Sequence, residues 1–218
     1  QLERVQGADE GRWHRLRLLP VHLPEQPTAT RLYTRRKGYR RWYHPCTCTK
    51  ISCMREIINP WVGMNGYCCF GCSPQNPLGT QMRFYEEGVG DEYADIISVW
   101  QPSQQHQSWI NTLHGGIQAT LLDEVCGWVV FKKLRTSGVT AKMELRYKNA
   151  VSTVNGPLVL KARLKSNNHH VALVEGELCD TEGKLLTQCE CTYISFSEDK
   201  AREMGFTTCE LEDEQMLF

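Results

Sequence analysis

A pair of glycines followed by two neighbouring carboxylates is the part of this sequence best suited to chemistry. Gly115 and Gly116 precede Asp123 and Glu124, and the residues between them are mostly apolar. Backbone N–H groups at a helix start stabilise developing negative charge. A helix beginning at the glycines therefore carries a possible oxyanion site, with a possible general base about two turns further on. The alternative is a capped helix whose two acids are satisfied by hydrogen bonds.

The residues after the glycines predict a long helix that is buried on most of its circumference. From Ile117 to Phe131 the side chains are mostly apolar, and we expect the helix to run roughly from 115 to 134. A buried carboxylate is costly unless it is paired or used, so Asp123 and Glu124 need partners. Gly138 is well placed to cap the end of the helix.

Strand patterns flank this helix on both sides. Before it, Met82–Glu86 and Tyr93–Trp100 flank a turn at 88–91, which predicts a hairpin, and a polar loop follows at 101–112. After it, alternation from Val139 to Tyr147 predicts a half-buried strand. Three more strands are predicted at Leu158–Lys165, Val171–Cys179 and Leu185–Phe196, the last two joined as a hairpin.

This order of elements predicts the fold class. A single helix that is apolar nearly all round requires a sheet that curls around it, which is an α+β hot-dog arrangement. One such unit leaves part of the helix uncovered, and a second copy would cover it. We therefore expect a homodimer.

The two ends of the chain differ from its centre. Residues 1–53 carry 11 Lys and Arg against 4 Asp and Glu and have little apolar periodicity. We expect 1–53 to be a disordered or non-native basic extension, 54–198 to be the hot-dog domain and 199–218 to be a loosely ordered acidic tail. The basic run at 35–41 could contact nucleic acid or an acidic membrane, but a solvated extension explains it more simply, so we expect neither partner.

Cysteine usage and hydropathy indicate a soluble cytoplasmic protein. No stretch approaches the roughly 18 apolar residues of a membrane span. The 11 cysteines include scattered residues typical of small buried thiols in a reducing compartment. Cys69 and Cys72 have metal-ligand spacing and could join Cys46 and Cys48 in a zinc site, but the latter pair is spaced too tightly. We predict no metal site.

From about Asn59 to Ser197 the sequence resembles the hot-dog acyl-CoA thioesterases of the phenylacetate-degradation (PaaI-like) type. His114-Gly115-Gly116, with Asp123 nine residues after the histidine, is similar to the spacing in that family. The segment Cys69–Gly79 resembles a leader found before the first strand in many relatives. The run Gly138–Ala141 resembles the start of the strand after the central helix.

The resemblance implies a role for each matching residue. The backbone N–H of Gly116, with that of Gly115, would stabilise the oxyanion. Asp123 of the other subunit would activate water or attack the thioester directly. The Thr140 hydroxyl would orient the water or the acid. His114 would hold the turn or bond near the thioester, and Glu124 is the rival base.

The resemblance also implies the substrate, which is an acyl-CoA, with no cofactor. In some relatives an Asn or Gln six residues before the histidine binds the thioester carbonyl; that position is Ser108 here, and Asn111 lies nearby as a substitute. Lys142 and Arg146 alternate on one strand face and would offer charge to the coenzyme A phosphates, although a solvated face explains them equally well. The site would be shared across a homodimer, or a dimer of such dimers. The alternatives are a non-catalytic acyl-CoA-binding module and an acyl-thioester hydratase or dehydratase.

Overall fold

The computed structural model describes residues 54–87, 95–207 and 209–211. The basic extension expected at 1–53 and the turn expected at 88–91 lie outside these residues, as does the end of the acidic tail from 212 onward. No helix in the described part of the chain is long and apolar enough to cross a membrane.

The long helix α1 spans Gly115–Leu134, as the sequence predicts. Its buried side chains face several directions around the axis, and they include Leu121, Leu122, Val125, Cys126, Trp128, Val129 and Val130. The predicted cap at Gly138 is wrong. Arg135 ends the helix in the left-handed conformation with φ of 53°, while Gly138 begins the next strand. A non-glycine residue thus supplies the left-handed turn that glycine usually supplies.

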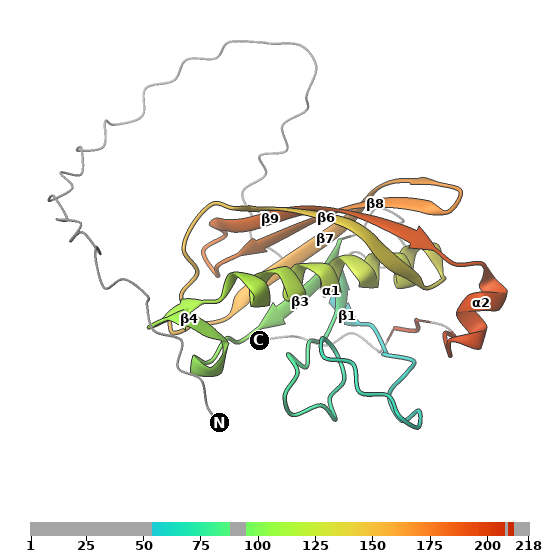
Figure 1. Ribbon diagram of the computed structural model, residues 1–218, viewed down its shortest axis with the longest axis horizontal. Helices are drawn as coiled ribbons and strands as arrows, with labels where there is room; N and C mark the ends of the chain where they lie inside the picture. Colours follow the sequence, from blue (N-terminus) through green and yellow to red (C-terminus); the bar gives the residue numbers. More distant parts are fainter. Residues whose placement is uncertain (1–53, 88–94, 208, 212–218) are drawn as a thin grey trace, which may run out of the picture. The chain divides into compact units, whose positions relative to one another are not determined.

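In the described residues, seven antiparallel strands form one sheet in the order β1-β2-β3-β7-β8-β9-β6. The strands are β1 (Met54–Glu56), β2 (Tyr85–Glu87), β3 (Ile96–Trp100), β6 (Gly138–Tyr147), β7 (Leu158–Asn168), β8 (Val171–Cys179) and β9 (Leu185–Ser195). Helix α1 packs against this sheet, and Figure 1 shows it running beneath β6 to β9. The predicted α+β hot-dog architecture, one long helix on an antiparallel sheet, is confirmed.

Several short elements differ from the sequence prediction. The strand expected at Met82–Glu86 begins only at Tyr85, because residues 82–84 are not part of the sheet ladder. The polar loop expected at 101–112 contains a short helix, η2 (Gln104–His106), and a hairpin of β4 (Gln107–Trp109) and β5 (Thr112–Leu113). These pieces are too short for a hydrophobic period to reveal.

The segment after β9 is ordered through a helix that the sequence does not predict. Helix α2 spans Glu198–Glu203, and the Ser197 side chain caps its start by accepting from the N–H of Lys200. Its first turn is acidic, which suits a helix N-terminus. Phe206, just beyond it, is buried. The loose order expected from residue 199 onward is therefore wrong for this part of the tail.

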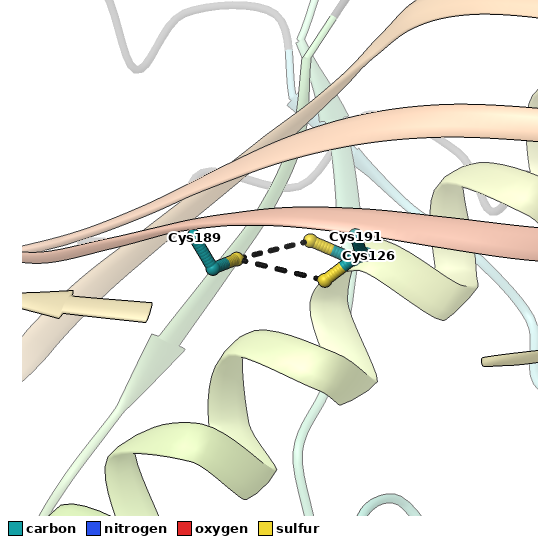
Figure 2. A group of neighbouring side chains, drawn as sticks. All are labelled: Cys126, Cys189 and Cys191. Atoms are coloured by element: carbon teal, nitrogen blue, oxygen red, sulfur yellow. Dashed lines mark hydrogen bonds between the residues drawn. The ribbon is translucent and has the colours of Figure 1, made fainter. Parts of the chain in front are cut away.

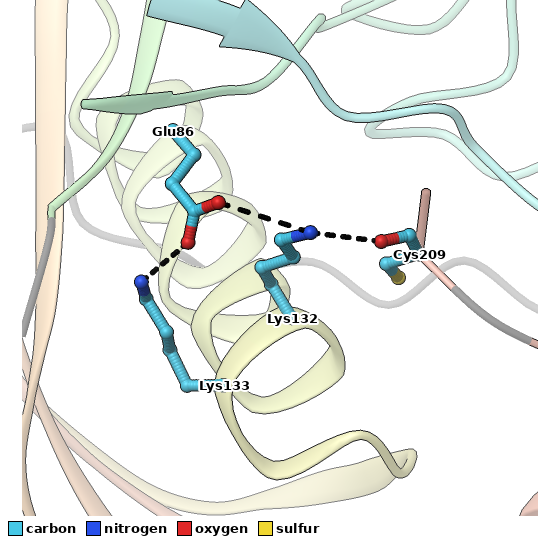
Figure 3. Close-up of polar contacts among 4 residues, drawn as sticks. All are labelled: Glu86, Lys132, Lys133 and Cys209. Carbon is cyan, nitrogen blue, oxygen red and sulfur yellow. Dashed lines mark hydrogen bonds and ion pairs between the residues drawn. The ribbon is translucent and has the colours of Figure 1, made fainter. Parts of the chain in front are cut away.

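The C-terminal end of α1 is fastened by a buried ionic cluster (Figure 3). Glu86 on β2 lies between Lys132 and Lys133, with Lys133 Nζ at 2.5 Å from Oε1 and Lys132 Nζ at 3.8 Å from Oε2. Lys132 also donates to the backbone carbonyl of Cys209 over 2.9 Å. The cluster joins the last turn of the helix both to the sheet and to the C-terminal segment.

A group of three thiols lies between α1 and the sheet. Figure 2 shows Cys126 of α1 and Cys189 and Cys191 of β9 pointing toward one another. Their sulfurs are separated by 3.7 Å from Cys126 to Cys189 and by 3.8 Å from Cys189 to Cys191. All three residues are buried, so the prediction that these scattered cysteines are core thiols is confirmed.

Candidate active site

The start of α1 is built by His114 and the two glycines. His114 is the N-cap, and its Nδ1 accepts a hydrogen bond from the N–H of Gly116 over 2.9 Å. The Tyr147 hydroxyl donates to the carbonyl of Gly115 over 3.0 Å. Among the described residues the N–H of Gly115 has no hydrogen-bond partner. The turn is at the surface, so its N–H groups can reach a ligand once the imidazole turns away from Gly116.

The Asp123 carboxylate is held by two hydroxyl groups. Thr140 Oγ1 donates to Asp123 Oδ1 over 2.8 Å. The Tyr193 hydroxyl lies 2.9 Å from the same Oδ1 and 2.8 Å from the Asp123 backbone carbonyl. In the described part of the chain Oδ2 of Asp123 has no partner. The carboxylate is thus fixed through one oxygen, and the other oxygen remains available as a base.

Tyr193 is the site residue that the sequence did not reveal. It lies on β9, directly opposite Thr140 in the register of β6 and β9, so both hydroxyls project from one face of the sheet. Burial raises the pKa of Tyr193 above its usual range, which keeps the phenol protonated and able to donate. The sequence pattern predicts the strand that contains Tyr193. The contact between Tyr193 and Asp123 could be assigned only from the register in which β9 pairs with β6.

Glu124 has different hydrogen-bond partners from the hydroxyl pair that holds Asp123. The Trp128 indole Nε1 donates to Glu124 Oε1 over 3.2 Å, and Cys69 Sγ lies 3.9 Å from the same oxygen. Burial, followed by the charge of Cys69, raises the pKa of Glu124 to about 7. Consecutive helix residues project about 100° apart, which sends the two acids to different partners.

A cavity of about 320 Å³ lies beside both acids. The residues around it are mostly apolar or aromatic, and they are Trp61, Tyr67, Cys69, Cys72, Asp123, Glu124, Gly127, Val130, Phe131, Gly138, Thr140 and Tyr193. A largely apolar cavity with a few convergent polar groups is the usual form of a small-molecule site. The site thus joins α1, the paired ends of β6 and β9, and the segment before β2.

The turn that contains Cys69 and Cys72 is fastened against α1. Thr80 N donates to the Phe70 carbonyl over 2.8 Å, and Thr80 Oγ1 donates to the Gly71 carbonyl over 2.8 Å. A Cβ atom at Gly71 would overlap the Glu124 carboxylate, so only glycine lets the turn approach this closely. The two cysteines and Glu124 are consequently brought together: their sulfur and carboxylate ligand atoms all lie within 4.8 Å of one another.

The two thiols of this turn have different environments. A hydrogen bond from the Cys72 thiol, outweighing partial burial, lowers the pKa of Cys69 to about 5. The same bond and burial raise the pKa of Cys72, whose sulfur lies 3.1 Å from the Tyr67 hydroxyl. Of the two thiols, Cys69 therefore has the lower pKa.

The residues predicted to contact coenzyme A are at the surface. Lys142 pairs with Glu144 on the same strand over 2.7 Å, and both side chains are exposed. Arg146 is exposed on the same strand and has no ion-pair partner among the described residues. Asn111 occupies the turn between β4 and β5 with φ of 58°, and its carbonyl accepts from Thr153 N. None of these three contacts Asp123.

The distance along α1 limits what one copy of the chain can do. Gly116 and Asp123 are seven residues apart, which is roughly 10 Å along a helix axis. A carbonyl group that is attacked beside Asp123 cannot also touch the N–H of Gly116 in the same chain. Gly116 and Asp123 can therefore contact one carbonyl group only if they come from two copies of the chain.

A long helix packed on an antiparallel sheet, with a carboxylate at a cavity beside it, defines a hot-dog domain with a candidate active site. Residues 110–187, which run from the turn before β5 into β9, match the thioesterase superfamily. The match covers a little over a third of the chain, including all of α1. No curated protein matches the sequence.

Several solved structures resemble the domain. A thioesterase superfamily protein is 24% identical with a TM-score of 0.49, and the match covers 56% of this chain and 57% of that one, a little over half of its length. A hypothetical thioesterase from Streptococcus pneumoniae TIGR4, solved with coenzyme A, is 18% identical with a TM-score of 0.47, covering 52% and 86%. A phenylacetic acid degradation-related protein from Ralstonia eutropha JMP134 is 23% identical with a TM-score of 0.45, covering 51% and 83%. At these levels the likeness concerns the fold alone.

Proposed function

We propose that this protein is an acyl-CoA thioesterase that hydrolyses its substrate to a free acid and coenzyme A. The observation that carries the proposal is the Asp123 carboxylate, fixed through Oδ1 by Thr140 and Tyr193 at the edge of the cavity. A carboxylate held in one orientation, with its second oxygen available, is arranged to take a proton from water. The apolar part of the cavity suits the acyl group.

The proposed reaction needs only groups of the protein and water. Asp123 Oδ2 takes a proton from a water molecule as the water oxygen attacks the thioester carbonyl. The negative charge that develops on the carbonyl oxygen is stabilised by the N–H groups of Gly115 and Gly116. The intermediate collapses by breaking the carbon–sulfur bond, and the coenzyme A sulfur leaves with the proton that Asp123 held.

One of the two proposed oxyanion donors is already engaged in a hydrogen bond within the protein. The N–H of Gly116 is occupied by His114 Nδ1, so the thioester oxygen has to displace the imidazole or share this donor with it. Gly115 supplies the second N–H. His114 is accordingly the residue that holds the turn in the absence of substrate.

We propose that the site is shared by two copies, because one chain cannot bring Gly116 and Asp123 to the same carbonyl. Strand β6 is at the edge of the sheet, and all of its residues are exposed or partly exposed. Val139 and Tyr147 on this strand are 49% and 55% exposed, although the alternation predicts that both face inward. An edge strand with exposed apolar side chains is suited to pairing with a second copy. A dimer of such dimers is compatible with the same contact.

Residues of this chain also support proposals for the type of thioesterase, the contacts with coenzyme A and the cellular compartment. The spacing from His114-Gly115-Gly116 to Asp123 and the leader at Cys69–Gly79 favour the phenylacetate-degradation type. Lys142 and Arg146, on exposed positions of β6, are the proposed contacts for the coenzyme A phosphates. The buried cysteines Cys126, Cys189 and Cys191 form no disulfide bond, which is typical of a reducing compartment and favours the cytoplasm.

Release of free thiol from a panel of acyl-CoAs tests this proposal. We expect turnover on at least one acyl-CoA with stoichiometric production of free acid. Tight binding without release would assign a binding module instead. Addition of water across the double bond of an enoyl-CoA, without thiol release, would assign a hydratase.

A further inference from the structure

Cys69, Cys72 and Glu124 form a second cluster of reactive groups that the proposed hydrolysis does not use. The two sulfurs and the carboxylate oxygen lie within 4.8 Å of one another. They come from one tight turn and from one position of α1, and together they line one side of the cavity. We propose that these three side chains bind a zinc ion, with water from the cavity in the fourth position.

The geometry of the cluster is close to that of a zinc site. Usual zinc–sulfur and zinc–oxygen bonds at a tetrahedral angle place a sulfur and an oxygen about 3.6 Å apart. Cys69 Sγ and Glu124 Oε1 are 3.9 Å apart. Only a small adjustment of the side chains is needed for both to reach one ion.

The ligands are also held in place before any metal arrives. Thr80 fastens both carbonyls of the Phe70–Gly71 segment, and Trp128 fixes the Glu124 carboxylate through its indole N–H. Asn59 donates to the Tyr67 hydroxyl over 2.8 Å, and that hydroxyl lies beside Cys72. Rigid supporting contacts of this kind are what orient the ligands of a metal site.

The charges around the cluster call for a cation. Glu124 is adjacent in sequence to Asp123, and its contacts among the described residues are the Trp128 indole and the sulfurs of Cys69 and Cys72. A partly buried carboxylate is unfavourable without a compensating positive charge. A divalent cation would supply that charge.

The donor set selects the metal. Two cysteines favour a soft or borderline ion, and the carboxylate disfavours copper(I). Iron–sulfur clusters generally need four cysteines. Three protein ligands with one open position are a usual arrangement for zinc. The sequence alone predicted no metal, because its spacing offered Cys46 and Cys48 as partners and gave no sign of Glu124.

The core thiols Cys126, Cys189 and Cys191 do not meet the same criteria. They too lie within 4.8 Å of one another. However, they are enclosed between the helix and the sheet, and a Cβ atom at Gly176 would overlap two of the sulfurs. Their group contains no carboxylate ligand, and none of the three lines the cavity beside Asp123, so they serve as an internal control.

Titration with cobalt(II), a spectroscopic probe for zinc sites, tests the proposal on the full chain after reduction and chelation. We expect one cobalt per chain, a thiolate-to-cobalt charge-transfer band, and displacement by zinc. Glu124→Gln, which keeps an acceptor for Trp128, should weaken cobalt binding at least about 10-fold, as the loss of a metal-site partner does. The double variant Cys69→Ser, Cys72→Ser should lose both the band and the bound metal.

Two control variants decide which thiols are responsible. Cys189→Ser and the pair Cys46→Ser, Cys48→Ser should bind cobalt as the unmodified chain does. Loss of binding in either control would overturn the proposal, as would unchanged affinity in Glu124→Gln or no stoichiometric metal in the unmodified chain. Circular dichroism of each chelated variant checks that it is folded.

Alkylation mapped by mass spectrometry gives a second measurement that does not depend on substitution. Zinc should protect Cys69 and Cys72 from modification and leave the exposed Cys68 reactive. Equal modification of Cys69 with and without zinc would contradict the proposal. Neither measurement involves acyl-CoA, so a failure here and a failure of the proposed hydrolysis are separate results.

Discussion

The hydroxyl of Tyr193 lies 2.9 Å from Oδ1 of Asp123, and this contact joins β9 to the middle of α1. Thr140, the register partner of Tyr193, reaches the same oxygen from β6. The pair of strands therefore sets the orientation of the carboxylate, and the carboxylate faces the cavity because the strands hold it there.

Replacing Tyr193 by phenylalanine should lower kcat more than it changes KM. The variant loses one hydrogen bond to a charged group, which is worth about 1.5–3 kcal/mol and corresponds to roughly 10- to 100-fold in rate. Steady-state thiol release measures both constants. Thr140→Val should act in the same direction, and the double variant should lose less than the product of the two effects because both bonds hold one oxygen. Independent, fully multiplicative losses would argue that the two hydroxyls do not position the same group.

A mixture of two inactive variants should recover activity if the site is shared. Asp123→Asn removes the proposed base, and Gly116→Pro removes the N–H donor at a helix position where proline is tolerated. After subunit exchange, mixed dimers would contain one site with both groups intact. Mixtures no more active than either parent, with exchange verified by mass spectrometry, would contradict the shared site.

Removing the Glu86 carboxylate should destabilise the domain strongly. Its side chain and that of Lys133 are 7% and 6% exposed, and Lys132 contacts it as well. Breaking a buried pair from one side costs about 3–5 kcal/mol, because the remaining charges stay buried. Denaturant unfolding of Glu86→Ala measures this change. The exposed pair of Arg202 and Glu198 provides the control, since Glu198→Ala should change the free energy of unfolding by no more than about 0.5 kcal/mol.

A single methyl group at Gly71 should disturb the cavity. The added Cβ atom would overlap the Glu124 carboxylate, and overpacking of this kind costs about 1–3 kcal/mol. Gly127→Ala is the matched control, because its Cβ atom would lie 3.8 Å from the Tyr193 hydroxyl, in ordinary contact. Within a helix this second change should stabilise by up to about 1 kcal/mol. An equal fall in the free energy of unfolding in both variants would contradict the claim that Gly71 is needed for the close approach to Glu124.

The sequence predicts those parts of the fold whose signal is periodic and long. The helix at 115–134 has the predicted bounds because glycines mark its start and apolar residues continue for several turns. The strands at Val171–Cys179 and Leu185–Ser195 are also close to prediction. Short strands such as β1 and β4 are set by their partners in space, which a local pattern does not contain. The cap of α1 was assigned to Gly138 rather than to Arg135, because Arg135 adopts a conformation that glycine usually takes.

Some residues of the candidate site could be predicted from the sequence, and others depend on contacts that only the fold creates. Asp123 and Thr140 stood out from the spacing of motifs, and the structure brings them within 2.8 Å of each other. Tyr193 could not be assigned, because nothing in a strand pattern says which residue lies opposite Thr140. The neighbourhood of Glu124 with Cys69 was equally hidden, since it depends on how the segment before β2 folds back on the helix.

The rate of thiol release by Asp123→Asn tests the central claim most directly. The substitution keeps the shape of the side chain and an acceptor for Thr140 and Tyr193, but it removes the base. We predict a fall in kcat of at least about 100-fold, the low end for losing a general base, while Glu182→Gln on an exposed turn leaves the rate unchanged. Turnover by Asp123→Asn equal to that of the unmodified chain, with the variant folded, would contradict the proposed role of Asp123.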